Sequence, residues 1–229
     1  MILVCAATGA EARACQRGIA AAGAHGLEVL RTGVGPRHAS RTLIRRLETG
    51  PRPRLVVSSG FAGTMTEGLN PLTWVTALSL YHLVGDRAVP AGVPPEMLCL
   101  VPGAQVCALV SADHVGGAGA PVGAPASPLA VDMESASLAE AASAAGIPLA
   151  VLRLVTDTPN APLPSIAWAV AATLASRAPL DRARQAARVF TEALADPIGA
   201  LEFARRSLRW CERLQDGWKG FAVTPWIRR

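Results

Sequence analysis

Acidic and glycine-rich motifs follow several short apolar runs of the sequence, at the points where strands would end. The carboxylates belong to Glu11 in TGAE, to Asp132 and Glu134 in VDMES and to Asp157 in TDT, and glycines fill TGVG (32–35) and SSGFAG (58–63). Ligands of open α/β sheets bind at the carboxyl ends of the strands, so motifs that are distant in sequence can converge there. Any single motif is explained more simply as a turn or helix cap. The whole set favours a site.

The side-chain types present exclude several kinds of active site. Lys219 is the only lysine, which argues against a P-loop and against Schiff-base chemistry in the core. The four histidines show no HxxxH spacing and the five cysteines no CxxC, so neither a metal site nor a disulfide framework is expected. The remaining carboxylates, backbone amides and hydroxyls suit acid–base chemistry on a polar organic substrate.

Short apolar runs alternate with helical patterns along the chain. Most of the runs are apolar on both faces, as in a parallel sheet covered by helices, and the alternation predicts an α/β fold. The expected strands span 2–7, 27–32, 54–60, 74–81, 104–111, 128–131 and 148–156. The expected helices span 11–22, 37–47 and 133–145, with two more near 164–176 and 197–215. Two Pro- and Gly-rich stretches, 85–103 and 116–128, are predicted to be surface loops.

The composition limits the partners and the location of the protein. The 229 residues are 51% hydrophobic, enough for one domain with a buried core. The net charge is +5, but nearly all of the positive charge is scattered arginine, so no nucleic-acid partner is expected. The N-terminus lacks a basic signal-peptide region, and no apolar run reaches the roughly 18 residues of a membrane helix. These features predict a cytoplasmic, soluble protein.

Three segments resemble, in order, motifs of the nucleoside phosphorylase and nucleosidase superfamily. They are LRTGVGPRHAS, VVSSGFAGTM and AVDMESASLAEAASAAGIPLAVLRLVTDT. The likeness is nearest to the methylthioadenosine/adenosylhomocysteine nucleosidases and the hopanoid-associated nucleoside phosphorylases, and covers roughly residues 1–160. It implies a three-layer αβα fold of the phosphorylase/hydrolase type with a mostly parallel or mixed central sheet. It further implies one domain over 1–229, in which 164–229 is a less typical helical region.

The resemblance implies cleavage of the N-glycosidic bond of a purine nucleoside, an adenosine with a modified 5′ group. Asp157 matches the general acid that protonates the departing base, which requires a pKa raised by burial or hydrogen bonding. Glu134 is implied to accept hydrogen bonds from the ribose hydroxyls and Met133 to pack against the sugar, which leaves Asp132 as a helix-capping candidate. Glu11 falls near the residue that orients the attacking water, although a Glu in a first helical turn also stabilises the helix.

The same resemblance implies roles for further positions. Phe61, Ala62 and Gly63 would lie beside base and sugar, and Phe61 could equally be core. His114 stands where a base-stacking aromatic residue is expected, or is an ordinary loop histidine. No cofactor or metal is implied, and a homodimer is expected.

The nucleophile stays open between water and phosphate as a co-substrate. Ser58 and Phe61 stand where purine phosphorylases carry an arginine and a serine for phosphate, which favours water. Arg13 or Arg37 could still supply a phosphate site, so phosphorolysis of the same bond is an alternative. A non-catalytic nucleoside-binding module and an α/β protein of unrelated role are the others.

The C-terminal third is rich in aromatic residues, Trp168, Trp210, Trp218, Phe221 and Trp226. They indicate helix packing, or alternatively an apolar pocket for a greasy 5′ substituent. An arginine-rich helix in the same region could lie on a membrane surface. Peripheral membrane contact is therefore an option if the substrate is lipidic.

Overall fold

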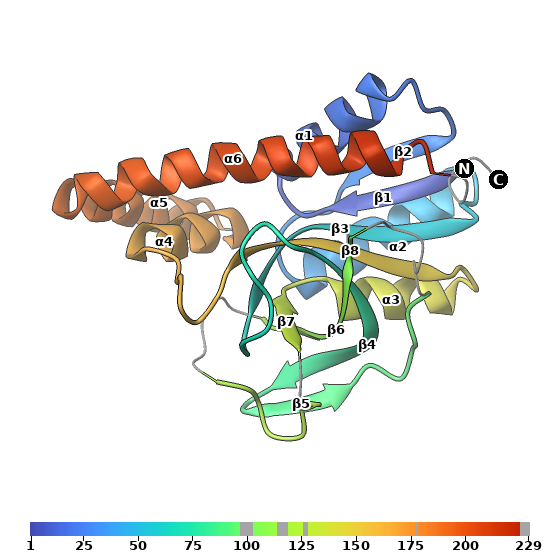
Figure 1. Ribbon diagram of the computed structural model, residues 1–229, viewed down its shortest axis with the longest axis horizontal. Coiled ribbons are helices and arrows are strands. Elements are labelled where there is room, and N and C mark those ends of the chain that lie inside the picture. The colour runs from blue at the N-terminus through green and yellow to red at the C-terminus, as the bar shows by residue number, and fades with distance from the viewer. Residues whose placement is uncertain (97–102, 114–118, 126–127, 177, 225–229) are drawn as a thin grey trace.

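The computed structural model describes residues 1–96, 103–113, 119–125, 128–176 and 178–224. Its strands are β1 (Ile2–Ala6), β2 (Leu27–Arg31), β3 (Leu55–Thr64), β4 (Trp74–Val84), β5 (Arg87–Pro90), β6 (Gln105–Ser111), β7 (Leu129–Asp132) and β8 (Leu149–Asp157). Its helices are α1 (Gly9–Ala21), α2 (Pro36–Thr49), α3 (Ser135–Ala144), α4 (Ser165–Ala175), α5 (Pro179–Ala195) and α6 (Pro197–Phe221). Figure 1 shows α6 as a long helix whose N-terminal end extends past the sheet, with α4 and α5 beside that end.

One mixed sheet contains all of these strands. β3 is parallel to β1 on one side and to β8 on the other, and β1 is parallel to β2. β8 meets β4 antiparallel, β4 and β7 flank β6 in parallel, and β7 returns antiparallel to the end of β3. The path β3–β8–β4–β6–β7–β3 is therefore closed, so part of the sheet curls into a small barrel.

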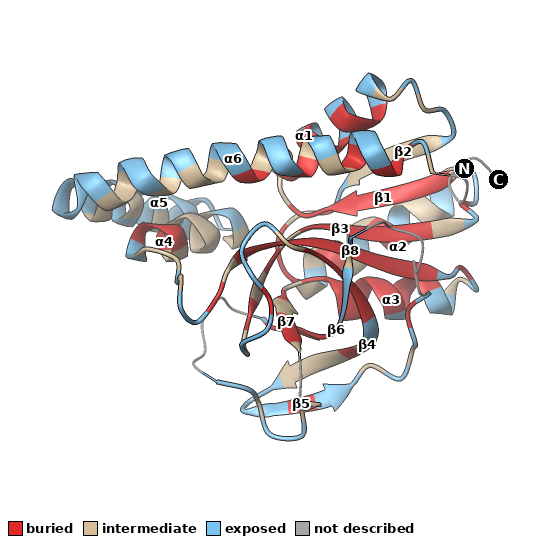
Figure 2. Cartoon of the chain, viewed as in Figure 1, coloured by how far each residue is buried: buried red, intermediate tan, exposed pale blue. Residues whose placement is uncertain are grey.

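Helices cover both faces of the sheet, as the alternation in β1 requires. Leu3 and Cys5 point into a core shared with α2 and α3. Ile2 and Val4 point into a second core shared with α1 and α6. Figure 2 shows the central strands as buried and the outer faces of the helices as exposed. The predicted three-layer α/β fold with a mixed sheet is confirmed.

α6 lies close to the sheet and to α1 because two glycines remove side chains at the contact. A Cβ at Gly18 would overlap the carbonyl oxygen of Gln215, and one at Gly217 would overlap the ring of Trp74. Trp218 is fully buried there, and its Nε1 donates to Ser59 Oγ at 2.9 Å. The packing role expected for the C-terminal aromatic residues is therefore seen for this tryptophan.

The structure differs from the sequence-based expectations at three places. Residues 87–90, predicted as loop, form β5, which pairs with β4 across a turn at Gly85 where φ is +63°. β3 continues past residue 60 to Thr64, through the glycine motif itself. α5 was not predicted, and none of its residues is buried. Within the described residues, no helix is long and apolar enough to cross a membrane.

Candidate active site

A cavity of about 390 Å³ lies where the carboxyl ends of parallel strands β1, β3 and β8 meet the start of α3. Seven residues singled out in the strand-end motifs line it together: Glu11, Phe61, Ala62, Gly63, Asp132, Met133 and Glu134. They come from three segments that are far apart in the chain. The convergence expected from the strand-end motifs is thus observed in the fold.

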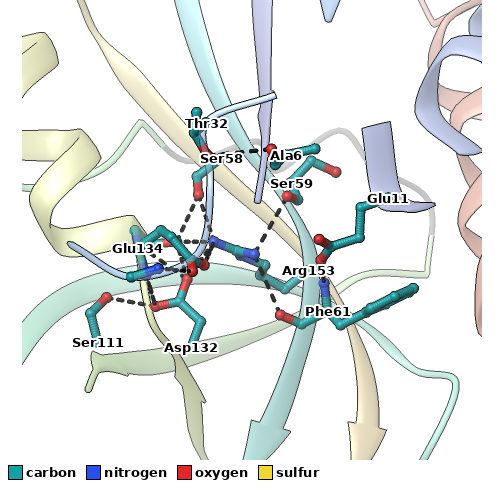
Figure 3. A network of polar contacts seen from close by, with 12 residues as sticks. Ala6, Glu11, Thr32, Ser58, Ser59, Phe61, Ser111, Asp132, Glu134 and Arg153 are labelled. Carbon is teal, nitrogen blue, oxygen red and sulfur yellow. Dashed lines mark hydrogen bonds and ion pairs between the residues drawn. The ribbon is translucent and has the colours of Figure 1, made fainter. Parts of the chain in front are cut away.

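A buried arginine that sequence analysis did not identify organises the polar side of the cavity (Figure 3). Arg153 lies on β8 and is 1% exposed. Its Nη2 forms ion pairs with Asp132 Oδ2 at 2.6 Å and with Glu134 Oε2 at 3.4 Å, and it donates to Ser58 Oγ at 2.9 Å. A charge in the middle of an apolar strand was the available signal, since an arginine is almost never fully buried without a partner.

Asp132 joins this network to the start of α3. Its Oδ2 accepts hydrogen bonds from the Ser135 amide at 3.1 Å and from the Ser135 hydroxyl at 2.5 Å. Its Oδ1 accepts from Ser111 Oγ at 2.6 Å. The N-cap residue of α3 is Glu134 and not Asp132, but Asp132 still binds the first amide of the helix, and the same carboxylate also neutralises Arg153.

Glu134 is held from two sides. Its Oε1 accepts from the Gly35 amide at 2.9 Å, and its Oε2 faces Arg153. Burial raises the pKa of Glu134 to about 7, because loss of hydration and the nearby Asp132 charge outweigh the attraction of Arg153. A carboxyl with such a pKa exchanges a proton near neutral pH.

Glu11 stabilises the start of α1 and also reaches the cavity. Its Oε2 accepts from Thr8 N at 2.8 Å and from Thr8 Oγ1 at 2.6 Å, which closes a capping box at the start of α1. Its Oε1 accepts from the Phe61 amide at 2.9 Å and so reaches β3 beside the cavity. Gly60 permits this approach, since its φ is +140° and a Cβ there would overlap Glu11 Oε1.

Asp157 lies at the margin of the cavity at the end of β8. It is not one of the cavity-lining residues in the described part of the chain, but its neighbours Gly63 and Thr156 are. A Cβ at Gly63 would stand 2.6 Å from Asp157 Oδ2. Burial raises the pKa of Asp157, opposed by the hydrogen bond that Thr156 Oγ1 donates at 2.7 Å and by the Arg206 charge.

The opposite wall of the cavity is apolar and helical. α4 contributes Val170 and Leu174, and α6 contributes Phe203 and Trp210. The Trp210 ring packs between Phe61 and Phe203, each with centroids 6.0 Å away. Phe61 therefore belongs to the wall as well as to the glycine motif.

Two other expectations concern residues outside this cavity. His114 and Trp226 lie outside the described residues. Arg13 and Arg37 do not line the cavity, and Arg37 instead borders a surface hollow on α2 with Arg41 and Arg45. In the described ranges, no three His, Cys, Asp or Glu side chains are arranged to hold a metal ion.

Comparison with solved structures shows that this fold is a known architecture. A 5′-methylthioadenosine/S-adenosylhomocysteine nucleosidase from Helicobacter pylori, with butyl-thio-DADMe-Immucillin-A, is 15% identical over 96% of each chain, with a TM-score of 0.61. The Arabidopsis thaliana 5′-methylthioadenosine nucleosidase is 15% identical over 97% of this chain and 95% of its own, with a TM-score of 0.62. Futalosine hydrolase of H. pylori is 15% identical over 95% of each chain, with a TM-score of 0.61.

The similarity to these proteins is one of fold. It agrees with the superfamily resemblance carried by the three sequence motifs and confirms the phosphorylase/hydrolase-like architecture. No protein-family model and no curated protein matches the chain.

Proposed function

We propose that this protein hydrolyses the N-glycosidic bond of a purine nucleoside, an adenosine with a modified 5′ group. One observation carries the proposal: three buried carboxylates, those of Glu11, Asp132 and Glu134, line a single cavity, and a fourth, Asp157, stands at its margin with a raised pKa. The shared fold with nucleosidases of H. pylori and A. thaliana supports it.

Asp157 is the general acid in this proposal. Cleavage leaves an oxocarbenium-like sugar, and the purine departs readily only when its N7 gains a proton. Burial favours the protonated form of Asp157, which is the form that donates. Thr156 holds Oδ1, so Oδ2, the oxygen beside cavity-lining Gly63, is the atom that would carry the proton.

The sugar would lie against the carboxylates. Glu134 accepts hydrogen bonds from the ribose hydroxyls, and Met133 packs against the ring. Glu11 orients the attacking water with lone pairs that Thr8 and Phe61 leave free, because an ionised carboxylate offers about four acceptor sites. A carboxylate that is ionised beside the sugar also stabilises the developing sugar cation. Ala62 and Gly63 lie beside base and sugar.

Water is favoured over phosphate by the charges around the cavity. Arg153 is the cation nearest to Glu134, and it is already shared between Asp132 and Glu134. Among the described residues that line the cavity, a phosphate dianion would meet the carboxylates of Glu11, Asp132 and Glu134 and no guanidinium, while it needs charge-assisted donors. Phosphorolysis remains the alternative reaction at the same bond.

The apolar wall supports a 5′ substituent without charge. Val170, Leu174 and Phe203 offer contacts to an alkyl or thioalkyl group and no partner for a charged one. The dimer implied by the family resemblance remains part of the proposal.

A nucleoside-binding module without catalysis is the second candidate. It is favoured because the carboxylates of Glu11 and Glu134 already accept hydrogen bonds from protein donors, which leaves fewer lone pairs for a substrate or a water molecule. Binding of a nucleoside with no turnover, unaffected by Asp157→Asn, would support it.

The test is incubation with 5′-methylthioadenosine, adenosine, inosine and an adenosyl lipid, each with and without phosphate. Base and sugar products are identified by mass. Free base plus free sugar without phosphate is the expected result. Sugar phosphate formed only with phosphate would mean phosphorolysis, and no free base from any substrate would favour the binding module.

A further inference from the structure

α5 presents its apolar side to solvent. Three of its large apolar side chains are largely exposed to solvent: Leu180 is 75% exposed, Phe190 65% and Leu194 66%. At 3.6 residues per turn these three share one face of the helix, and the alanines at 183, 186 and 187 fill the same face. None of the helix's residues is buried, and Figure 2 shows α5 largely in the exposed colour.

The inner side of α5 mixes polar and apolar residues. Gln185, Val189, Glu192 and Ala193 are partly buried, and among the described residues Gln185 Oε1 is buried with no hydrogen-bond partner. An ordinary surface helix turns its apolar face to the core and its polar face to water. The large apolar side chains of α5 instead face outward, which leaves an apolar surface that no described residue of the chain covers.

Charge is distributed around that surface in a pattern that identifies its occupant. Arg182 and Arg184 are exposed and border the apolar face on its two sides by helical spacing. The acids of α5, Asp181 and Glu192, lie away from the apolar face, and each forms an ion pair at 3.8 Å, with Arg184 and Arg188 respectively, so the three arginines outnumber the two acids on this helix. An apolar face edged by arginines matches the boundary between acyl chains and anionic headgroups, where long basic side chains extend toward the headgroups.

The cavity wall also carries exposed apolar surface. Leu174, in the last turn of α4, lines the cavity and is itself 49% exposed, and α4 packs against α5.

We propose that α5 docks this protein on the surface of an anionic lipid bilayer, with Leu180, Phe190 and Leu194 inserted among the acyl chains. The helix lies in the interface and does not span it, in keeping with its 17 residues. The docking stands on α5 itself and holds whether or not the chain cleaves nucleosides.

Cosedimentation with vesicles tests the proposal. The wild-type chain is mixed with phosphatidylcholine vesicles and with vesicles that also contain phosphatidylglycerol, and the anionic vesicles are expected to bind more protein. Phe190→Ser combined with Leu194→Ser should weaken binding about tenfold or more, since two large apolar side chains no longer leave water. Because both side chains are exposed, the variant should keep the wild-type Tm.

Two matched controls distinguish insertion of α5 from nonspecific hydrophobic binding and from nonspecific electrostatic binding to the vesicles. Val84→Ser with Val89→Ser removes apolar side chains that are 59% and 42% exposed on the β4–β5 hairpin, and should leave binding unchanged. Arg184→Gln should weaken binding to anionic vesicles about fivefold and not to neutral ones. Arg45→Gln, at an exposed position on α2, should change neither.

Several outcomes would overturn the proposal. Absence of cosedimentation with both vesicle types would do so, as would equal losses in the α5 variant and the hairpin control. If analytical ultracentrifugation shows a dimer that Phe190→Ser/Leu194→Ser dissociates, and vesicles do not bind, a second copy of the chain covers this face instead. Base release from a water-soluble nucleoside, measured in the same variants, reports separately on the proposed function.

Discussion

The two sides of the cavity differ in how their side chains are held. On the strand side, Arg153, Asp132 and Glu134 are buried and bound to one another and to backbone amides. On the helical side, Val170 is only partly buried and Leu174 is exposed, and neither side chain has a polar atom that could make a directional contact. The first arrangement fixes positions of charge to within a hydrogen-bond length, and the second fixes only shape and polarity.

This difference assigns separate consequences to the two sides. A substitution on the strand side breaks interactions that stabilise the fold and also position the proposed chemistry. A substitution in the wall leaves the network intact and changes only which substituent the cavity accepts. The following predictions test that separation, beginning with the largest effect.

Asp157→Asn should reduce base release by about a hundred- to ten-thousandfold, the usual contribution of a placed general acid. Asn keeps the size of the side chain and can still accept from Thr156 Oγ1, so the fold should be unchanged. The measurement is kcat for the substrate found in the incubation test, with exposed Asp181→Asn on α5 as the control. A loss of less than about tenfold would assign the acid to another group.

Arg153→Met should destabilise the fold by about 3–5 kcal/mol, because it leaves two buried carboxylates without their cation. Urea unfolding measures the change. Arg209→Met, at an exposed position of α6, should remain within about 0.5 kcal/mol of the wild type. Equal stability of the two variants would show that the network contributes position and not stability.

The same difference between the two sides explains what the sequence can predict. Parallel strands share a common carboxyl edge, so the strand-end motifs after β1 and β3 predict that Glu11 and Gly63 lie together, as they do around the cavity. Glu134 follows β7, which is antiparallel to β3, and it joins them because the sheet closes on itself there. Sequence analysis misses Arg153 because the segment is recognised as a strand by the apolar residues around it, and one arginine does not change that assignment. Its partner Asp132 is missed because helix capping already explains an acid at that position. An arginine in a strand that is buried on both faces needs a nearby carboxylate to neutralise it, and this rule would have paired Arg153 with Asp132.

The helical region is less predictable for a physical reason. Sequence patterns identify helices by the apolar face that they bury, and α5 buries none of its residues. β5 was not predicted because it is a short edge strand, and the proline and glycine residues around it are typical of a loop. The position of Asp157 beside Gly63, and not in the cavity lining, depends on side-chain packing that no spacing rule contains.

The raised pKa of Glu134 makes the stability of the strand side depend on pH. A carboxyl with a folded pKa of about 7 and an unfolded pKa of 4.5 binds its proton more tightly when folded. Its contribution to the free energy of unfolding is therefore full below pH 4.5 and is lost as the pH rises toward about 7. The slope for one proton is at most about 1.4 kcal/mol per pH unit.

Glu134→Gln should remove that slope, because glutamine does not titrate. Urea unfolding of wild type and variant across this pH window gives the difference, and Glu202→Gln, at an exposed position on α6, is the control. If wild type and Glu134→Gln vary with pH in parallel, Glu134 is ionised throughout, and Arg153 outweighs its burial.

The apolar wall should discriminate among substrates by small steps. In a series of adenosines with 5′-thioalkyl groups, each added methylene that enters the cavity should lower KM about three- to fourfold, the value of one buried CH₂. Val170→Phe fills part of the wall and should abolish this dependence while KM for the shortest member stays within about threefold. Ala186→Phe, on the outer face of α5 and away from the cavity lining, should keep the wild-type series. A KM that ignores chain length in the wild type would mean that the 5′ group points away from α4, and that the wall only closes the site to water.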